Sequence, residues 1–160
     1  MEPPLTSDTP FAGFPPRKLN NNVVRCVLMS DSVSAILYPT VLLAEDSQDT
    51  RSMLKRAFEL KGYKVLEAED GQEALVMARR CRPSLIVIDL NMPVLDGLAA
   101  VKNVREMEPP GEQVPIVAIT AYDVPGMEDA ALETGCDRYL RKPLDLEELD
   151  RALRSFGFVV

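Results

Sequence analysis

Acidic, hydroxyl and amino side chains recur in this chain directly after short apolar segments. Glu45 and Asp46 follow one such segment, and Asp89 follows a second, which is apolar throughout. Thr120 ends a third segment, and Lys142 comes after a fourth. Three carboxylates brought together would repel one another unless cations neutralise them. Lys142 and one divalent cation could do so, and magnesium suits an open site of oxygen ligands.

A phosphoryl group would complete such a site. Magnesium keeps several of its waters and binds phosphate oxygens together with one or two carboxylates. An aspartate can accept a phosphoryl group covalently. We therefore predict that Asp89, the central carboxylate, accepts a phosphoryl group. Mg²⁺ would be the cofactor, shared by Glu45, Asp46 and Asp89.

The segments that position these residues alternate between two patterns. Short apolar or β-branched runs predict strands, and apolar residues three or four positions apart predict helices. The first helical pattern places Met53, Leu54, Ala57 and Phe58 on one side and stops at Gly62. The predicted strands cover residues 41–44, 63–68, 85–89, 115–120 and 137–141, and the later helices end before residue 83 or cover 97–107, 126–134 and 146–156.

Five strand–helix pairs predict an α/β protein of the (βα)5 type, with a doubly wound, five-stranded parallel sheet. Strands that are apolar throughout are buried on both faces, so helices must cover both faces of the sheet. In such sheets, functional side chains lie just beyond the carboxyl ends of the strands. The acidic, hydroxyl and amino side chains should therefore meet along one edge.

The same positions carry a resemblance to a known family. In short motifs at the predicted strand ends, the chain resembles the receiver domains of two-component response regulators, over about residues 40–156. The motifs are AED at 44–46, DLNMPVLDG at 89–97, TA at 120–121 and YLRKP at 139–143. The resemblance implies the flavodoxin-like strand order 2-1-3-4-5. Glu45 stands where the family usually has aspartate, which is a common variation.

The resemblance also implies roles for the acidic residues and the lysine. Asp89 would be the phosphoacceptor, and Glu45 and Asp46 would be the acidic pair that binds Mg²⁺. The metal would also be held by Asp89 and by the main-chain carbonyl of Asn91. Lys142 would neutralise the phosphoryl oxygens, and its peptide bond to the following proline is expected to be cis.

Further residues would form the phosphate-binding and switch region. Thr120, followed by Ala121, would donate a hydrogen bond to the phosphoryl group, and Tyr139 would turn inward when Thr120 moves. Output would come from the face formed by the fourth helix, the fifth strand and the fifth helix. Tyr122 is bulky and two positions beyond Thr120, so we expect it to shield the phosphoryl group from water.

The chain has no histidine, so a phosphohistidine donor must belong to another protein. We expect this partner to be a histidine kinase or a histidine phosphotransfer protein. The chain would be a signalling receiver, not an enzyme, and would catalyse only its own phosphoryl transfer and slow autodephosphorylation. Little sequence follows the fifth helix, so a stand-alone receiver is expected, with a receiver excised from a hybrid kinase as the alternative.

Other classes of protein fit the sequence less well. A phosphatase of the haloacid dehalogenase type needs a second aspartate two residues after the first, where this chain has Asn91. A receiver-like interaction module that is not phosphorylated remains the alternative, although such modules normally lack an acidic or lysine site residue. A nucleotide-binding fold would need a glycine-rich loop after a strand, and none is found.

Residues 1–39 differ from the rest and are interpreted as a flexible, proline-rich leader before a receiver domain at 40–160. They hold six of the 13 prolines and three charges of each sign. The remaining 15 basic and 22 acidic residues therefore account for the whole net charge of −7. This acidic balance argues against nucleic-acid binding, which favours basic surfaces.

The sequence also predicts a cytoplasmic protein without membrane contact. No apolar run approaches the roughly 18 residues that a transmembrane helix needs. The three cysteines are an odd number and lack metal-site spacing. Cys26, Cys81 and Cys136 are therefore expected to be ordinary thiols of a reducing compartment and to form no disulfide framework.

Overall fold

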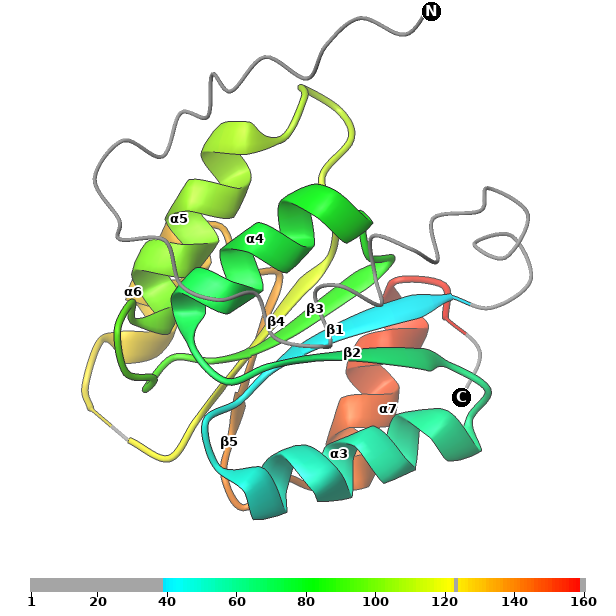
Figure 1. Ribbon diagram of the computed structural model, residues 1–160. Coiled ribbons are helices and arrows are strands. Elements are labelled where there is room, and N and C mark those ends of the chain that lie inside the picture. Colours follow the sequence, from blue (N-terminus) through cyan, green and yellow to red (C-terminus); the bar gives the residue numbers. More distant parts are fainter. Residues whose placement is uncertain (1–38, 123, 159–160) are drawn as a thin grey trace, which may run out of the picture.

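The computed structural model describes residues 39–122 and 124–158 (Figure 1). Strands and helices alternate through these residues, as the sequence predicts, and most observed ends fall within one or two residues of the predicted ones. Nearly all of the predicted leader lies outside the described residues. The strands are β1 (Thr40–Ala44), β2 (Lys64–Ala68), β3 (Leu85–Asp89), β4 (Ile116–Thr120) and β5 (Arg138–Arg141). The helices are α3 (Gln48–Leu60), α4 (Gly71–Cys81), α5 (Gly97–Met107), α6 (Met127–Thr134) and α7 (Leu146–Ser155).

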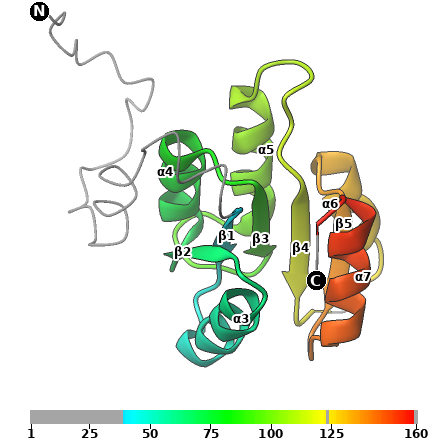
Figure 2. The ribbon, with the colours of Figure 1, turned by 90° about the vertical axis from the view of Figure 1, so that its right-hand side faces the viewer.

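The strands form one parallel sheet in the order β2-β1-β3-β4-β5. The predicted doubly wound (βα)5 fold and its strand order are therefore confirmed. Helices α4, α5 and α6 cover one face of the sheet, and α3 and α7 cover the other (Figures 1 and 2). The chain reverses its winding direction between β1 and β3, and ligand sites of such sheets lie at this point.

Alternation along the central strands explains why both faces are apolar. In β1, Leu42 and Ala44 pack under α4 and α5, whereas Val41 and Leu43 pack under α3 and α7. All five residues of β3 are buried, including the terminal Asp89. A strand buried on both faces needs a continuous apolar run. The buried carboxylate of Asp89 at its end does not serve core packing and therefore indicates a functional role.

Helix α3 departs from its predicted face in one respect. Met53 was expected to point inward with Leu54, but it is half exposed, whereas Arg51 is buried. Leu54 and Phe58 do form part of the core. Arg51 lies three residues before Leu54 and seven before Phe58, so a charged side chain shares the apolar stripe of this helix.

A second, partly buried arginine organises the amino-terminal edge of the sheet. The Arg105 guanidinium donates to the Gly135 carbonyl at 2.7 and 2.9 Å and to the Val114 carbonyl at 2.8 Å. It also forms ion pairs with Glu108 at 2.7 Å and with Asp137 at 2.9 Å. Arg105 thus connects the end of α5 to the segments that enter β4 and β5.

Two of the three cysteines lie in the part of the chain that the structure describes. Cys81, at the end of α4, packs partly buried against the core beneath α4, α5 and α6. Cys136 is free, and burial raises the pKa of its thiol to about 12. Cys26 lies outside the described residues. Within 39–122 and 124–158, no helix is long and apolar enough to cross a membrane.

Gly97 brings α5 against the end of β3. A Cβ at this position would overlap the main-chain carbonyl of Asp89 and lie 2.6 Å from Leu90 Cα. The main-chain N–H of Gly97 donates to the Leu90 carbonyl at 3.2 Å. Glycine is therefore required here by close packing of two backbones, not by an unusual dihedral angle.

We predict that Gly97→Ala destabilises the protein. Alanine in place of glycine within a helix usually gains about 0.5–1 kcal/mol. Here the overlap with the Asp89 carbonyl should reverse the sign and cost about 1–3 kcal/mol of unfolding free energy, as for other overpacked sites. Urea denaturation of the two proteins measures the difference. A more stable Gly97→Ala protein would contradict the close approach.

Candidate functional site

The carboxyl ends of four strands bring the predicted site residues to one edge of the sheet (Figure 1). Glu45 follows β1 directly, and Asp89 ends the neighbouring β3. Thr120 ends β4 and is in register with Arg141 of β5, which precedes Lys142. The main-chain N–H of Lys142 donates to the Thr120 carbonyl at 2.8 Å, which joins the last two strand ends.

Three carboxylates form the centre of the site. Glu45, Asp46 and Asp89 each offer an oxygen atom, and these atoms lie within 4.8 Å of one another. Glu45 and Asp89 are buried, whereas Asp46 is exposed. Ser47 is the N-cap of α3 and accepts from the Thr50 N–H at 3.4 Å. The cap therefore belongs to Ser47, which leaves the carboxylate of Asp46 available to a ligand.

Lys142 is placed between the two buried carboxylates. Its Nζ lies 2.7 Å from Glu45 Oε2 and 2.8 Å from Asp89 Oδ2. The Lys142–Pro143 peptide bond is cis, as expected. The other oxygens of the two acids accept main-chain hydrogen bonds, Glu45 Oε1 from Ser47 at 3.2 Å and Asp89 Oδ1 from Asn91 at 2.9 Å. Both buried acids are thereby fixed in orientation.

Burial and charge shift the pKa values of two groups in the cluster. Burial is the main cause that raises the pKa of Glu45, and the negative charge of Asp89 adds to it, against the opposing contact with Lys142. Burial works against the charged form of Lys142, but its contacts with Asp89 and Glu45 outweigh it and raise the Lys142 pKa. The cluster thus favours the protonated, positively charged form of Lys142 and disfavours the ionised form of Glu45.

The donor set fits a hard divalent cation such as Mg²⁺. The ligand atoms available are carboxylate oxygens, and Asp46 opens the cluster to water. Mg²⁺ keeps several waters and uses one or two carboxylates, so an edge open to solvent suits it better than a closed cage would. Three carboxylates facing one ammonium also leave an excess of negative charge for a cation to neutralise.

Thr120 and the residues after it border the acidic cluster. Thr120 is buried, and its hydroxyl accepts the Tyr122 N–H at 3.2 Å. Ala121 is exposed, and 57% of Tyr122 is exposed. The end of β4 thus holds a buried hydroxyl, and an exposed tyrosine follows it two residues later.

Tyr139 lies outside the acidic cluster. It pairs with Ala118 in the sheet and packs, partly buried, against the core beneath α4, α5 and α6. Its hydroxyl donates a long hydrogen bond, 3.5 Å, to the Tyr122 carbonyl. Tyr139 therefore reaches the site through the segment that follows β4.

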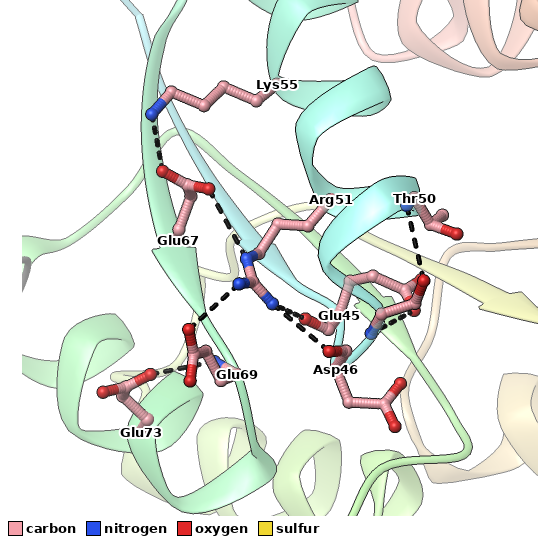
Figure 3. Close-up of polar contacts among 9 residues, drawn as sticks. Glu45, Asp46, Thr50, Arg51, Lys55, Glu67, Glu69 and Glu73 are labelled. Atoms are coloured by element: carbon pink, nitrogen blue, oxygen red, sulfur yellow. Dashed lines mark hydrogen bonds and ion pairs between the residues drawn. The ribbon is translucent and has the colours of Figure 1, made fainter.

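Sequence reasoning missed Arg51, which supports the acidic pair from behind (Figure 3). Its Nη1 donates to the main-chain carbonyl of Glu45 at 2.7 Å and to that of Asp46 at 3.4 Å. The signal was present in the sequence, because Arg51 occupies the apolar stripe of α3. Periodicity does not predict which groups pair with a buried charge, however, and every residue has a main-chain carbonyl, so the sequence does not indicate which ones accept from Arg51.

Comparison with known proteins places this geometry in context. The family model for the response regulator receiver domain matches residues 41–154. Curated relatives include the transcriptional regulatory protein PrrA of Mycobacterium tuberculosis, 40% identical over 116 residues, which are 72% of this chain and 48% of PrrA. The response regulator MprA of Mycobacterium leprae is 40% identical over 115 residues, 72% of this chain and 49% of MprA. The chain thus spans about half the length of these relatives.

Solved structures show the same fold. The receiver domain of sensor histidine kinase PA1611 from Pseudomonas aeruginosa, with a magnesium ion coordinated in its active-site cleft, is 34% identical with a TM-score of 0.68. The match covers 76% of this chain and 99% of that one. The Francisella response regulator 1452 receiver domain is 32% identical with a TM-score of 0.67 and covers 74% and 97%. With its parallel sheet, its acidic edge and these matches, the chain belongs to the response regulator receiver domain family of two-component systems.

Proposed function

We propose that this chain accepts a phosphoryl group on Asp89 from a phosphohistidine of another protein. The observation that carries the proposal is the placement of Lys142 within 2.8 Å of Asp89 and 2.7 Å of Glu45, inside a cluster of three carboxylates. Phosphoryl transfer needs positioning and charge neutralisation more than covalent help. The cluster offers both, at an edge that a partner can approach.

In the proposed step, a carboxylate oxygen of Asp89 forms a bond to phosphorus while the phosphorus–nitrogen bond of the phosphohistidine breaks. The imidazole leaves with the electron pair of that bond. The Lys142 ammonium stabilises the phosphoryl oxygens, and the Asn91 N–H holds the Asp89 carboxylate in place. Mg²⁺ would be held by Glu45, Asp46, Asp89 and the Asn91 main-chain carbonyl, and it would supply positive charge to the transferred group.

The signal would follow from the new charge. An aspartyl phosphate carries about two negative charges at neutral pH where the free carboxylate carries one, so phosphorylation adds about one negative charge and three oxygens to the site. The Thr120 hydroxyl, which accepts the Tyr122 N–H, would move to donate a hydrogen bond to a phosphoryl oxygen. The segment from Ala121 onward would follow, and Tyr139 would move inward. The states would then differ on the face formed by α6, β5 and α7. A ligand shifts an equilibrium only through such differential contacts.

The proposal extends to partners and location. The donor would be a histidine kinase or a histidine phosphotransfer protein in the cytoplasm, and the target would be a protein that contacts the α6–β5–α7 face. We propose no nucleic-acid or membrane contact for residues 40–160, which carry the whole net charge of −7. The domain would act as a signalling receiver and turn over only its own phosphoryl group.

We predict that acetyl phosphate with Mg²⁺ adds the mass of one phosphoryl group to the protein. Asp89→Asn should remove this labelling, because an amide cannot accept the group, and chelation of the metal should suppress it. Intact-protein mass spectrometry measures both effects. The matched control is Asp49→Asn, which alters an exposed acid in the first turn of α3. Undiminished labelling of Asp89→Asn would exclude the acceptor, and an unlabelled wild type would favour a non-phosphorylated interaction module.

We also predict that Tyr122→Ala shortens the lifetime of the aspartyl phosphate. Tyr122 is exposed and follows Thr120 by two positions, and we propose that its ring hinders an attacking water. Its loss should speed dephosphorylation by up to about tenfold, which corresponds to about 1.4 kcal/mol in the barrier. Decay of the phosphorylated mass with time measures the rate. Tyr122→Phe keeps the ring and should decay like the wild type, whereas equal lifetimes for all three proteins would exclude shielding.

A further inference from the structure

The main chain of the acidic pair is held by a buried guanidinium. Arg51, on α3, has only 9% of its side chain exposed. Its Nη1 reaches the carbonyl oxygens of Glu45 and Asp46. Figure 3 shows that the Asp46 carboxylate points away from the guanidinium. Arg51 therefore grips the backbone from which the site acids project, and it leaves their carboxylates to the ligand.

The opposite side of the guanidinium is anchored to the end of β2 (Figure 3). Arg51 Nη2 donates to Glu69 Oε1 at 2.9 Å, and Nε lies 3.4 Å from Glu67 Oε1. Glu67 is also paired with Lys55 at 2.6 Å. The turn after β1 is thus tied to the neighbouring strand through one rigid, planar group, a geometry that a lysine ammonium cannot reproduce.

We infer that Arg51 is a positioning residue for the cation site, and this inference rests on the proposed function. Groups that orient metal ligands without touching the metal typically contribute a factor of about 10–100 in metal affinity. Arg51 would act in this way through the main chain of Glu45 and Asp46. Without it, the two carbonyls would lose a buried donor, and the turn would be free to move the acids relative to Asp89.

Simple electrostatics makes the opposite prediction. Arg51 carries a positive charge close to a site for a cation, so its removal alone should tighten cation binding. Positioning predicts weaker binding when Arg51 is lost, because the ligand atoms are no longer held together. The sign of the effect on Mg²⁺ affinity therefore distinguishes the two roles. Arg51→Lys is a second test, because it retains the charge but not the geometry of the guanidinium.

The experiment titrates Mg²⁺ alone into the full chain by calorimetry. We expect Arg51→Met to raise the dissociation constant about 10–100-fold. Arg51→Lys should also bind more weakly than the wild type, although less so than Arg51→Met. Lys55→Met removes a charge from the same network without touching the carbonyls, and we expect it to bind nearly as the wild type does.

A second control addresses loss of stability. Arg105→Met breaks a comparable set of carbonyl contacts and ion pairs at the amino-terminal edge. It should lower the stability of the fold and leave Mg²⁺ affinity unchanged. Thermal unfolding of each variant shows whether it is folded at the titration temperature, and the charge-preserving Arg51→Lys keeps the comparison valid if Arg51→Met unfolds.

A second readout uses phosphorylation by acetyl phosphate. In Arg51→Met, the Mg²⁺ concentration at half-maximal labelling should rise, while the extent of labelling at saturating Mg²⁺ stays as in the wild type. Equal or tighter Mg²⁺ binding by both Arg51 variants would overturn the positioning role and leave the proposed function intact. A wild type that binds no Mg²⁺ would overturn both.

Discussion

The contact of Lys142 with two buried carboxylates is the constraint on which the rest of the structure depends. Carboxylates excluded from water are costly unless a positive charge compensates them. Glu45 and Asp89 satisfy this requirement only because their strands are adjacent and because β5 returns a lysine to the same edge. The contact of Lys142 with Glu45 and Asp89 thus depends on the parallel pairing and the order of the strands. Burial of the apolar core depends on the same topology.

Residues next to the site fulfil the local backbone requirements, so the site carboxylates are not needed as helix caps. Ser47 caps α3, so Asp46 is spared that task, and Asp96 caps α5 by accepting from the Ala99 N–H. Gly97 lets the same helix begin in contact with the carbonyl of Asp89. The residues around the site are therefore divided between those that shape the backbone and those that present oxygen atoms to a ligand.

Much of this arrangement could be predicted from the sequence, because its signals are local. An apolar run that ends in Asp89, and a lysine before proline after the last strand, indicate strand ends, and parallel topology then brings them together. Arg51 could not be found in this way, because it depends on the carbonyl groups of a turn and on acids at the end of another strand. The predicted inward position of Met53 was wrong for a related reason: periodicity cannot decide whether Met53 or Arg51 faces the core.

Two arginines, the buried Arg51 and the partly buried Arg105, use the same kind of contact for two purposes in this fold. Each donates to main-chain carbonyls and is balanced by two acids, Arg51 by Glu67 and Glu69, and Arg105 by Glu108 and Asp137. The carbonyls held by Arg105 belong to Val114 and Gly135, which lead into the amino ends of β4 and β5. Those held by Arg51 belong to the residues that bear the site carboxylates. The contacts of Arg105 therefore stabilise the fold. By our inference, those of Arg51 also set the geometry of the cation site, because the main chain that Arg51 holds determines where the Glu45 and Asp46 carboxylates lie.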